Sequence, residues 1–85
     1  MAETKMRVLE GEWSRIAAGG TVTVANESGN YLFWIVSEGT TAPTLKGGHR
    51  LSPYSNQSFA LEDGEHLWVK GSGTVFFTAA NPVEA

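Results

Sequence analysis

Two histidines, His49 and His66, are the side chains of this sequence best suited to acid–base chemistry or metal binding. An imidazole exchanges a proton near neutral pH, and its ring nitrogens are common metal ligands. A metal site or a catalytic dyad also needs further ligands or an acidic partner at a suitable spacing, and the chain offers no cysteine and no such spacing. We therefore expect two ordinary histidines, one in a loop and one in a strand, and no metal.

Two short motifs resemble ion-binding loops. "EDGE" at 62–65 clusters carboxylates that suit Ca²⁺, but its spacing is not that of an EF-hand, and Asp63-Gly64 is a strong turn signal. "KGGHR" at 46–50 sets glycines beside basic residues, as phosphate loops do, yet lacks the following Ser or Thr and a strand–loop–helix context. We expect a turn and a plain loop. Without a Ser/His/Asp arrangement or paired carboxylates, the sequence predicts neither an enzyme nor a cofactor.

Length and charge limit the remaining functions. A chain of 85 residues predicts one domain, 1–85, with short tails at 1–5 and 81–85 and a marginal core. Because there is no cysteine to form disulfides, oligomerisation is the expected source of added stability. A net charge of −3 argues against nucleic acid or an anionic membrane as partner. No apolar run suits a membrane span or a signal peptide, so we expect synthesis and folding in a cytoplasm.

The fold class follows from the spacing of turn signals. Groups of Gly, Asn, Asp and Ser recur every 8–12 residues or so, between segments rich in Thr, Val and aromatic residues. This pattern is typical of an all-β protein, a small antiparallel sandwich or barrel of about six to seven strands. The expected strands are Glu12–Ala17, Gly20–Ala25, Tyr31–Val36, a weaker one near Leu45–Leu51, Gln57–Glu62, Glu65–Lys70 and Thr74–Ala79.

Two turn signals predict the register of the C-terminal strands. A hairpin closed at Asp63-Gly64 places Phe59 opposite Trp68, and a second hairpin closed by "GSG" at 71–73 places Trp68 opposite Phe76. One face of this three-stranded unit is then apolar enough to be core. It carries Ala60, Leu67, Val69, Val75 and Phe77, and the opposite face carries Phe59, Trp68 and Phe76.

The stretch "NYLFWIV" at 30–36 is apolar on both faces of a predicted strand. A loop at "NESGN", 26–30, pairs Val24 with Leu32 on an inner face and leaves the alternate residues outside. Monomers seldom expose large apolar patches, so the outer faces predict an oligomer or partner interface. Its residues are Tyr31, Phe33, Ile35, Phe59, Trp68 and Phe76. The alternative is that a barrel twist, or the loop 37–50, covers the outer face of this strand.

Aromatic side chains on a β-face also build sugar-stacking platforms. Trp13 and Tyr54 are the aromatic residues most expected to be exposed in such a role. Protein contact is favoured because Phe59 and Phe76 offer no polar group to a hydroxyl-rich ligand.

Four features between Glu12 and Thr78 carry a resemblance: a first strand containing Trp13, "GGTVTV" at 19–24, a strand ending before "TTAPT", and the "LEDGEHLWVKGSG" segment. Together they resemble the short β-rich structural proteins of tailed bacteriophages. The resemblance implies a capsid decoration or cement protein on the virion surface, made in the host bacterial cytoplasm. It implies as partners a second copy of the chain, in a trimer, and the major capsid protein. Similar modules also occur in tails, baseplates and fibres, so the alternative is a module of that kind, with host-surface glycans as a candidate ligand.

Overall fold

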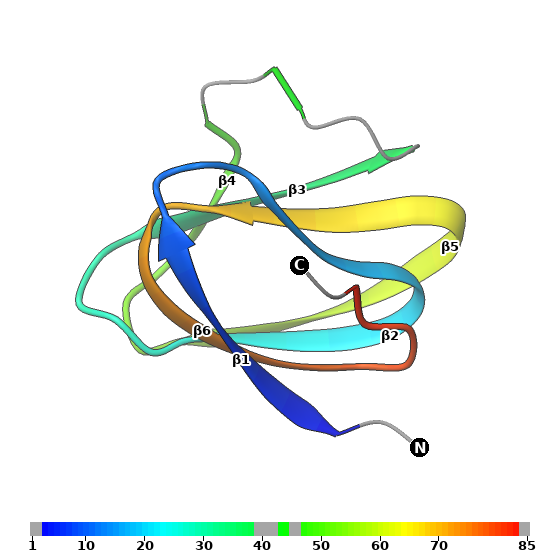
Figure 1. The fold of residues 1–85 in the computed structure, drawn as a ribbon, viewed down its shortest axis with the longest axis horizontal. Coiled ribbons are helices and arrows are strands. Elements are labelled where there is room, and N and C mark those ends of the chain that lie inside the picture. Colours follow the sequence, from blue (N-terminus) through cyan, green and yellow to red (C-terminus); the bar gives the residue numbers. More distant parts are fainter. Residues whose placement is uncertain (1–2, 39–42, 45–46, 84–85) are drawn as a thin grey trace.

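Six antiparallel strands form one sheet in the computed structural model of the protein, which describes residues 3–38, 43–44 and 47–83. The sheet curls into an open half-barrel (Figure 1), and no helix is present in the described ranges. The prediction of a small antiparallel all-β fold is thus confirmed. The strands are β1 (Thr4–Glu10), β2 (Ser14–Asn26), β3 (Leu32–Glu38), β4 (His49–Leu51), β5 (Asn56–Lys70) and β6 (Ser72–Ala79), in the spatial order β1-β6-β2-β5-β3-β4.

Strand β2 replaces the two strands predicted over 12–25. The chain passes through Gly19 and Gly20 with φ of 68° and 74°, a conformation open mainly to glycine, and continues in the same strand. One edge of β2 pairs with β5 along its length, while the other edge pairs with β6 only from Val22 onward. The first half of that second edge bonds instead to the chain end, where the Val83 amide donates to Ile16 O. These changes of neighbour along one strand accompany the curl of the sheet.

The hairpin predicted at Asp63-Gly64 is wrong. Both halves of the predicted hairpin belong to β5 and pair with β2, with Leu61 opposite Gly20 and His66 opposite Ala18. Residues 62–65 therefore stand opposite Gly19 alone, as a large bulge. Gly64 does take a positive φ of 86°, and the Glu62 amide donates to Glu65 Oε1 at 2.7 Å. The local turn chemistry is present, but the chain rejoins the same partner strand afterwards.

The other two predicted hairpins are also wrong. β6 lies between β1 and β2, so Trp68 does not face Phe76, and β3 lies between β5 and β4, so Val24 does not face Leu32. At "GSG" the chain turns a corner between two strands that are not neighbours. Gly71 is required there, because its φ is 144° and an added Cβ would lie 2.5 Å from Leu32 Cδ2.

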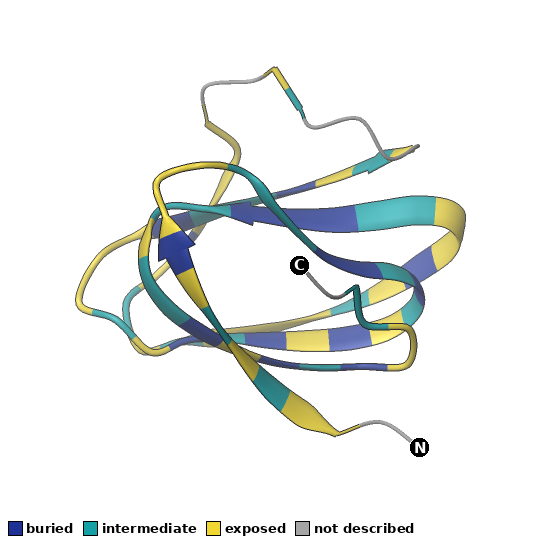
Figure 2. Cartoon of the chain, in the orientation of Figure 1, coloured by how far each residue is buried: buried dark blue, intermediate teal, exposed yellow. Residues whose placement is uncertain are grey.

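Most of the core face was predicted correctly, although the pairing of the strands that carry it was wrong. Alternation along a strand depends only on the strand's own residues, whichever strand pairs with it. Figure 2 shows this alternation of buried and exposed residues along β2. The prediction was wrong at Ala60, which is exposed, whereas its neighbour Phe59 packs against the core. The core consists of Leu9, Ile16, Ala17, Val22, Val24, Leu32, Leu51, Leu61, Leu67, Val69, Val75, Phe77 and Ala79.

One fully buried polar side chain, Asn26, ends β2 and holds the following loop. Its Nδ2 donates to the carbonyl oxygens of Asn30, Leu51 and Ser52 at 2.8–3.1 Å. Its Oδ1 accepts from the Ser28 amide at 3.0 Å and from Ser28 Oγ at 2.7 Å. A buried amide with both ends occupied offsets the cost of removing it from water. Asn26 thereby ties the loop 26–30 to the end of β4.

Candidate protein-interaction surface

The outer face of β1 and β6 carries an exposed apolar row. Met6 stands opposite Phe76, and Phe76 stands opposite Ala25 of β2 on its other side. Residues directly opposite each other in an antiparallel pair point to the same face, so these side chains adjoin. Met6 is 60% exposed, Phe76 40%, and Val8, two residues further along β1, 59%. Three large apolar side chains therefore meet solvent on one face.

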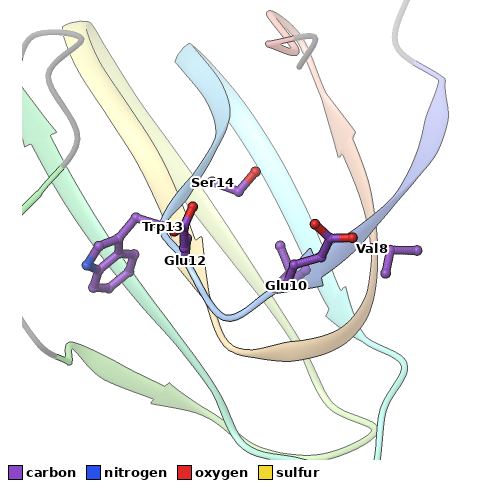
Figure 3. Close-up of a pocket in the computed structure, with 6 residues that line it drawn as sticks. Val8, Glu10, Glu12, Trp13 and Ser14 are labelled. Carbon is purple, nitrogen blue, oxygen red and sulfur yellow. The ribbon is translucent and has the colours of Figure 1, made fainter.

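A row of hydroxyl groups borders the apolar row. Thr78 of β6 pairs with Thr4 on one side and with Thr23 on the other. The Oγ1 atoms of Thr4 and Thr78 lie 2.8 Å apart, and Thr23 Oγ1 lies 2.9 Å from Ser58 Oγ. The face thus combines apolar side chains with a row of hydroxyl groups at one end, and the exposed Glu10 follows Val8 at the other end (Figure 3). This composition is typical of protein interfaces, whose centres are depleted of charge.

The outer face of β3 and β5, by contrast, is covered. Ile35 stands opposite Trp68, and the two are only 8% and 5% exposed although neither belongs to the main core. A Cβ added at Gly48 would lie 2.5 Å from Ile35 Cγ2 and 3.3 Å from Cη2 of Trp13. The chain at Gly48 and the Trp13 ring therefore lie over this face. The sequence left open whether the segment 37–50 covers the outer face of β3. At Gly48 the structure shows that it does.

Three polar atoms on the same covered face lack hydrogen bonds. His66 stands opposite Ser37, and Trp68 follows two residues later on the same side of β5. Ser37 Oγ, His66 Nδ1 and Trp68 Nε1 are buried and have no hydrogen-bond partner among the described residues. An unsatisfied buried polar atom keeps its desolvation cost, so this face is less stably packed than its burial implies.

The six predicted interface residues do not form one surface. Ile35 and Trp68 are the covered pair, and Phe33, half-buried, stands opposite Lys70. Phe59 lies on the core side, where its ring meets the Trp34 ring edge-on with centroids 4.5 Å apart.

Only two of the six are exposed. Tyr31 is 54% exposed, with the Arg50 guanidinium 5.8 Å from its ring, and Phe76 lies in the apolar row of β6. The interface role of all six stays a prediction, but Phe59, Trp68 and Phe76 do not share the face assigned to them.

Strand β1 was absent from the predicted strands, although its residues alternate between the two faces. The exposed positions carry Met6 and Val8, whereas Lys5 and Arg7 are half-buried. Thr4 and Lys5, expected in a tail, lie in this strand. Alternation of this kind predicts a strand, but with Met6 and Val8 on its buried face, the reverse of what the structure shows. The one available signal was the strict period of two over residues 4–8.

The inward position of Arg7 has a structural cause. Its Nη1 donates to Ser14 Oγ at 3.0 Å and to the Arg15 carbonyl, and its Nη2 donates to the carbonyl of Val83. The guanidinium also lies 5.4 Å from the centre of the Phe77 ring. Burial lowers the pKa of the Arg7 guanidinium from its usual value. Arg7 thus bridges β1, the start of β2 and the C-terminal segment.

An open hollow of about 160 Å³ lies where β1 turns into β2. Figure 3 shows Glu10 beside Val8, with the Trp13 ring turned toward the opposite side. The carboxylates of Glu10 and Glu12 are exposed at its rim, and Leu9 and Ser14 complete the lining. A carboxylate beside an aromatic ring can receive a sugar hydroxyl, but no flat aromatic platform is formed here. Tyr54, the other aromatic residue considered for that role, is 73% exposed and lies elsewhere.

The side chains suited to chemistry are dispersed. His49 is exposed on β4 with its ring 4.5 Å from that of Trp34, and His66 is on β5. "EDGE" forms the bulge described above, and Lys46 of "KGGHR" lies outside the described residues. In the described part of the chain no three His, Asp or Glu side chains gather as a metal site would require.

Comparison with known proteins gives no relative. No family model matches the sequence, and neither a curated protein nor a solved structure matches it significantly. Over residues 3–38, 43–44 and 47–83, no helix is long and apolar enough to cross a bilayer.

Proposed function

We propose that the protein is a non-catalytic structural subunit that works by protein–protein contact within a larger particle. Its contact surface is the outer face of β1 and β6. The observation that carries the proposal is the apolar row, in which Met6, Val8 and Phe76 are each at least 40% exposed on one face. A domain this small gains stability by sharing surface, because its own core is limited.

Capsid decoration is the specific form of this function that the sequence resemblance favours. A decoration protein needs a compact fold and a surface that binds the assembled shell, and it needs no catalytic group. An outer β-face with an apolar centre beside hydroxyl groups suits such a role. The proposed partners are the phage major capsid protein and further copies of the chain.

The proposal is tested on purified particles of the phage whose genome encodes the chain. Quantitative mass spectrometry should find the protein at a copy number comparable with that of the major capsid protein. A gene lying beside the capsid gene agrees with this outcome. Absence of the protein from the particles would refute the proposal, and a few copies per particle would move it to the tail.

A tail, baseplate or fibre module that binds glycans is the second candidate. It is favoured by the hollow that Glu10, Glu12 and Trp13 line together, which brings one aromatic residue and two carboxylates to the same opening. Glycan-array binding that is lost on Trp13→Ala and kept on Tyr54→Ala would support it. An array without binding would remove this candidate and leave the protein-contact proposal in place.

A further inference from the structure

Strand β1 is an edge of the sheet with one neighbour, β6, among the described residues. The Gly11 amide donates to Gly71 O at 2.9 Å, which extends the β1–β6 register beyond Glu10. Hydrogen bonding alternates along an antiparallel pair, so every second residue of β1, counted back from Gly11, bonds to β6. The residues between these, which include Met6 and Val8, turn their N–H and C=O groups to the free edge.

This edge lacks the usual protection against pairing. Natural edge strands carry outward charges, prolines or bulges that prevent another strand from adding. Between Thr4 and Glu10 the outward side chains of β1 are Met6 and Val8, about 60% exposed each. The basic side chain of Arg7 gives no protection, because its guanidinium is held inside by Ser14, Arg15 and Val83.

We propose that the β1 edge pairs with the β1 edge of a second copy, antiparallel, across a two-fold axis at Arg7. In this register all seven residues of the strand are paired. Met6 stands opposite Val8 of the second copy and Thr4 opposite its Glu10. The two apolar rows then join into one surface that runs over both sheets. This inference rests on the proposed function, since a second copy of the chain is one of the partners named there.

Strand length and facing select this register over its neighbours. The two copies of Arg7 stand opposite each other at the axis, but each guanidinium is bonded inward to its own chain. A shift that centres the pair on Met6 pairs only residues 4–8 of each strand and leaves two residues of β1 unpaired. A shift to Val8 sets Met6 opposite Glu10. Shifts by one residue reverse the faces and turn the apolar side chains toward the polar side. A parallel arrangement would place Lys5 and Glu10 each beside its own copy, which the antiparallel register avoids.

The other edge of the sheet is a poorer partner. β4 has three residues, and its His49 and Arg50 are exposed. Pairing β1 with β4 of a second copy would use fewer than half of the β1 residues. A two-fold dimer follows, in place of the trimer implied by the resemblance, because an isologous interface needs a self-complementary element.

Single cysteine variants test the register, since the chain has no cysteine of its own. We expect an equimolar mixture of Met6→Cys and Val8→Cys to give a covalent dimer on mild oxidation, while each variant alone stays monomeric on a non-reducing gel. Cross-linking of Met6→Cys alone, of Val8→Cys alone, or of none would overturn the proposed pairing, because disulfides form only between closely placed Cα atoms.

A second measurement separates pairing from loss of fold. Val8→Lys should raise the dimer dissociation constant at least tenfold in sedimentation, and Val36→Lys, at an exposed valine of β3, should not. Circular dichroism should show the fold of both variants. A wild-type chain that stays monomeric at high concentration contradicts the inference; if it is still abundant in particles, the proposed function stands. If the cysteine variants cross-link but the protein is absent from particles, the dimer stands and the proposed function is refuted.

Discussion

Met6 and Phe76 face each other across β1 and β6 on the outside of the sheet, 60% and 40% exposed. Their immediate neighbours Arg7 and Val75 point inward, where Val75 is fully buried. Strand alternation therefore places the apolar pair outside by necessity once Val75 and Phe77 are in the core. An interface that covers Met6 and Phe76 would remove this exposed apolar area from water.

Phe76→Thr tests that pair without weakening the strand. Threonine favours strands and matches Thr74 and Thr78 on either side. The monomer should stay folded, and attachment to the capsid shell should weaken by about 2 kcal/mol, as for other buried aromatic anchors. Co-sedimentation of the protein with capsids measures the loss. Tyr54→Thr, at a more exposed aromatic residue away from the row, should change nothing. Equal effects of the two substitutions would argue against a specific contact.

Leu67→Ala tests the core face. Leu67 is fully buried opposite Ala17 and Val36, so its truncation removes burial and leaves a cavity. We expect the free energy of unfolding to fall by about 2–5 kcal/mol in urea denaturation. Ala60→Ser, at an exposed position of the same strand, should cost less than about 0.5 kcal/mol. A small loss at Leu67 would mean that its face is not the core.

Asn26→Ala should destabilise the fold by about 1–3 kcal/mol, because buried hydrogen-bond partners lose the amide that occupies them. Thermal or urea unfolding measures the change. Asn30→Ala is the control, since that side chain is exposed and donates one bond, to Ser72 O at 3.0 Å. If the two variants are equally stable, Asn26 does not hold the loop.

Ser37→Ala should leave stability unchanged or raise it slightly, because in the described part of the chain the buried Ser37 hydroxyl has no hydrogen-bond partner to lose. Ser28→Ala provides the contrast. Its hydroxyl donates to Asn26 Oδ1 at 2.7 Å, and we expect a loss of about 0.5–1.5 kcal/mol. A clear destabilisation by Ser37→Ala would show that this hydroxyl is bonded in solution.

Residue alternation made the core predictable, whereas strand neighbours were not. Leu67 and Val69 are buried for reasons contained in β5 itself, but Asp63-Gly64 has the same local chemistry in a bulge as in a hairpin. Likewise, the backbone of Gly71 allows the corner between β5 and β6 as readily as the tight turn of a hairpin. Which one forms depends on the strands that pair across the sheet, and a local turn signal does not contain that information.

The candidate surface was predictable only at Phe76. Its partner Met6 belongs to a strand whose exposed residues are apolar and whose half-buried ones are basic. That inversion is explained by the hydrogen bonds of Arg7 to Ser14 and Val83. Ser14 is separated from β1 by a turn and Val83 is distant in the sequence, so neither contact could be read from the strand itself. Trp68 was assigned to the outer face, where it lies opposite Ile35, but its burial there could not be foreseen without the folded chain.

Amide hydrogen exchange along β1, measured from nanomolar concentration upward, tests most directly the central claim that this strand is an assembly edge. Amides facing a free edge exchange quickly, and pairing protects them. The Met6 and Val8 amides should slow as concentration rises, while that of Arg7, bonded within the sheet, changes little. Exchange at Met6 and Val8 that is independent of concentration, with new protection at Tyr31 or Phe33 instead, would contradict the account.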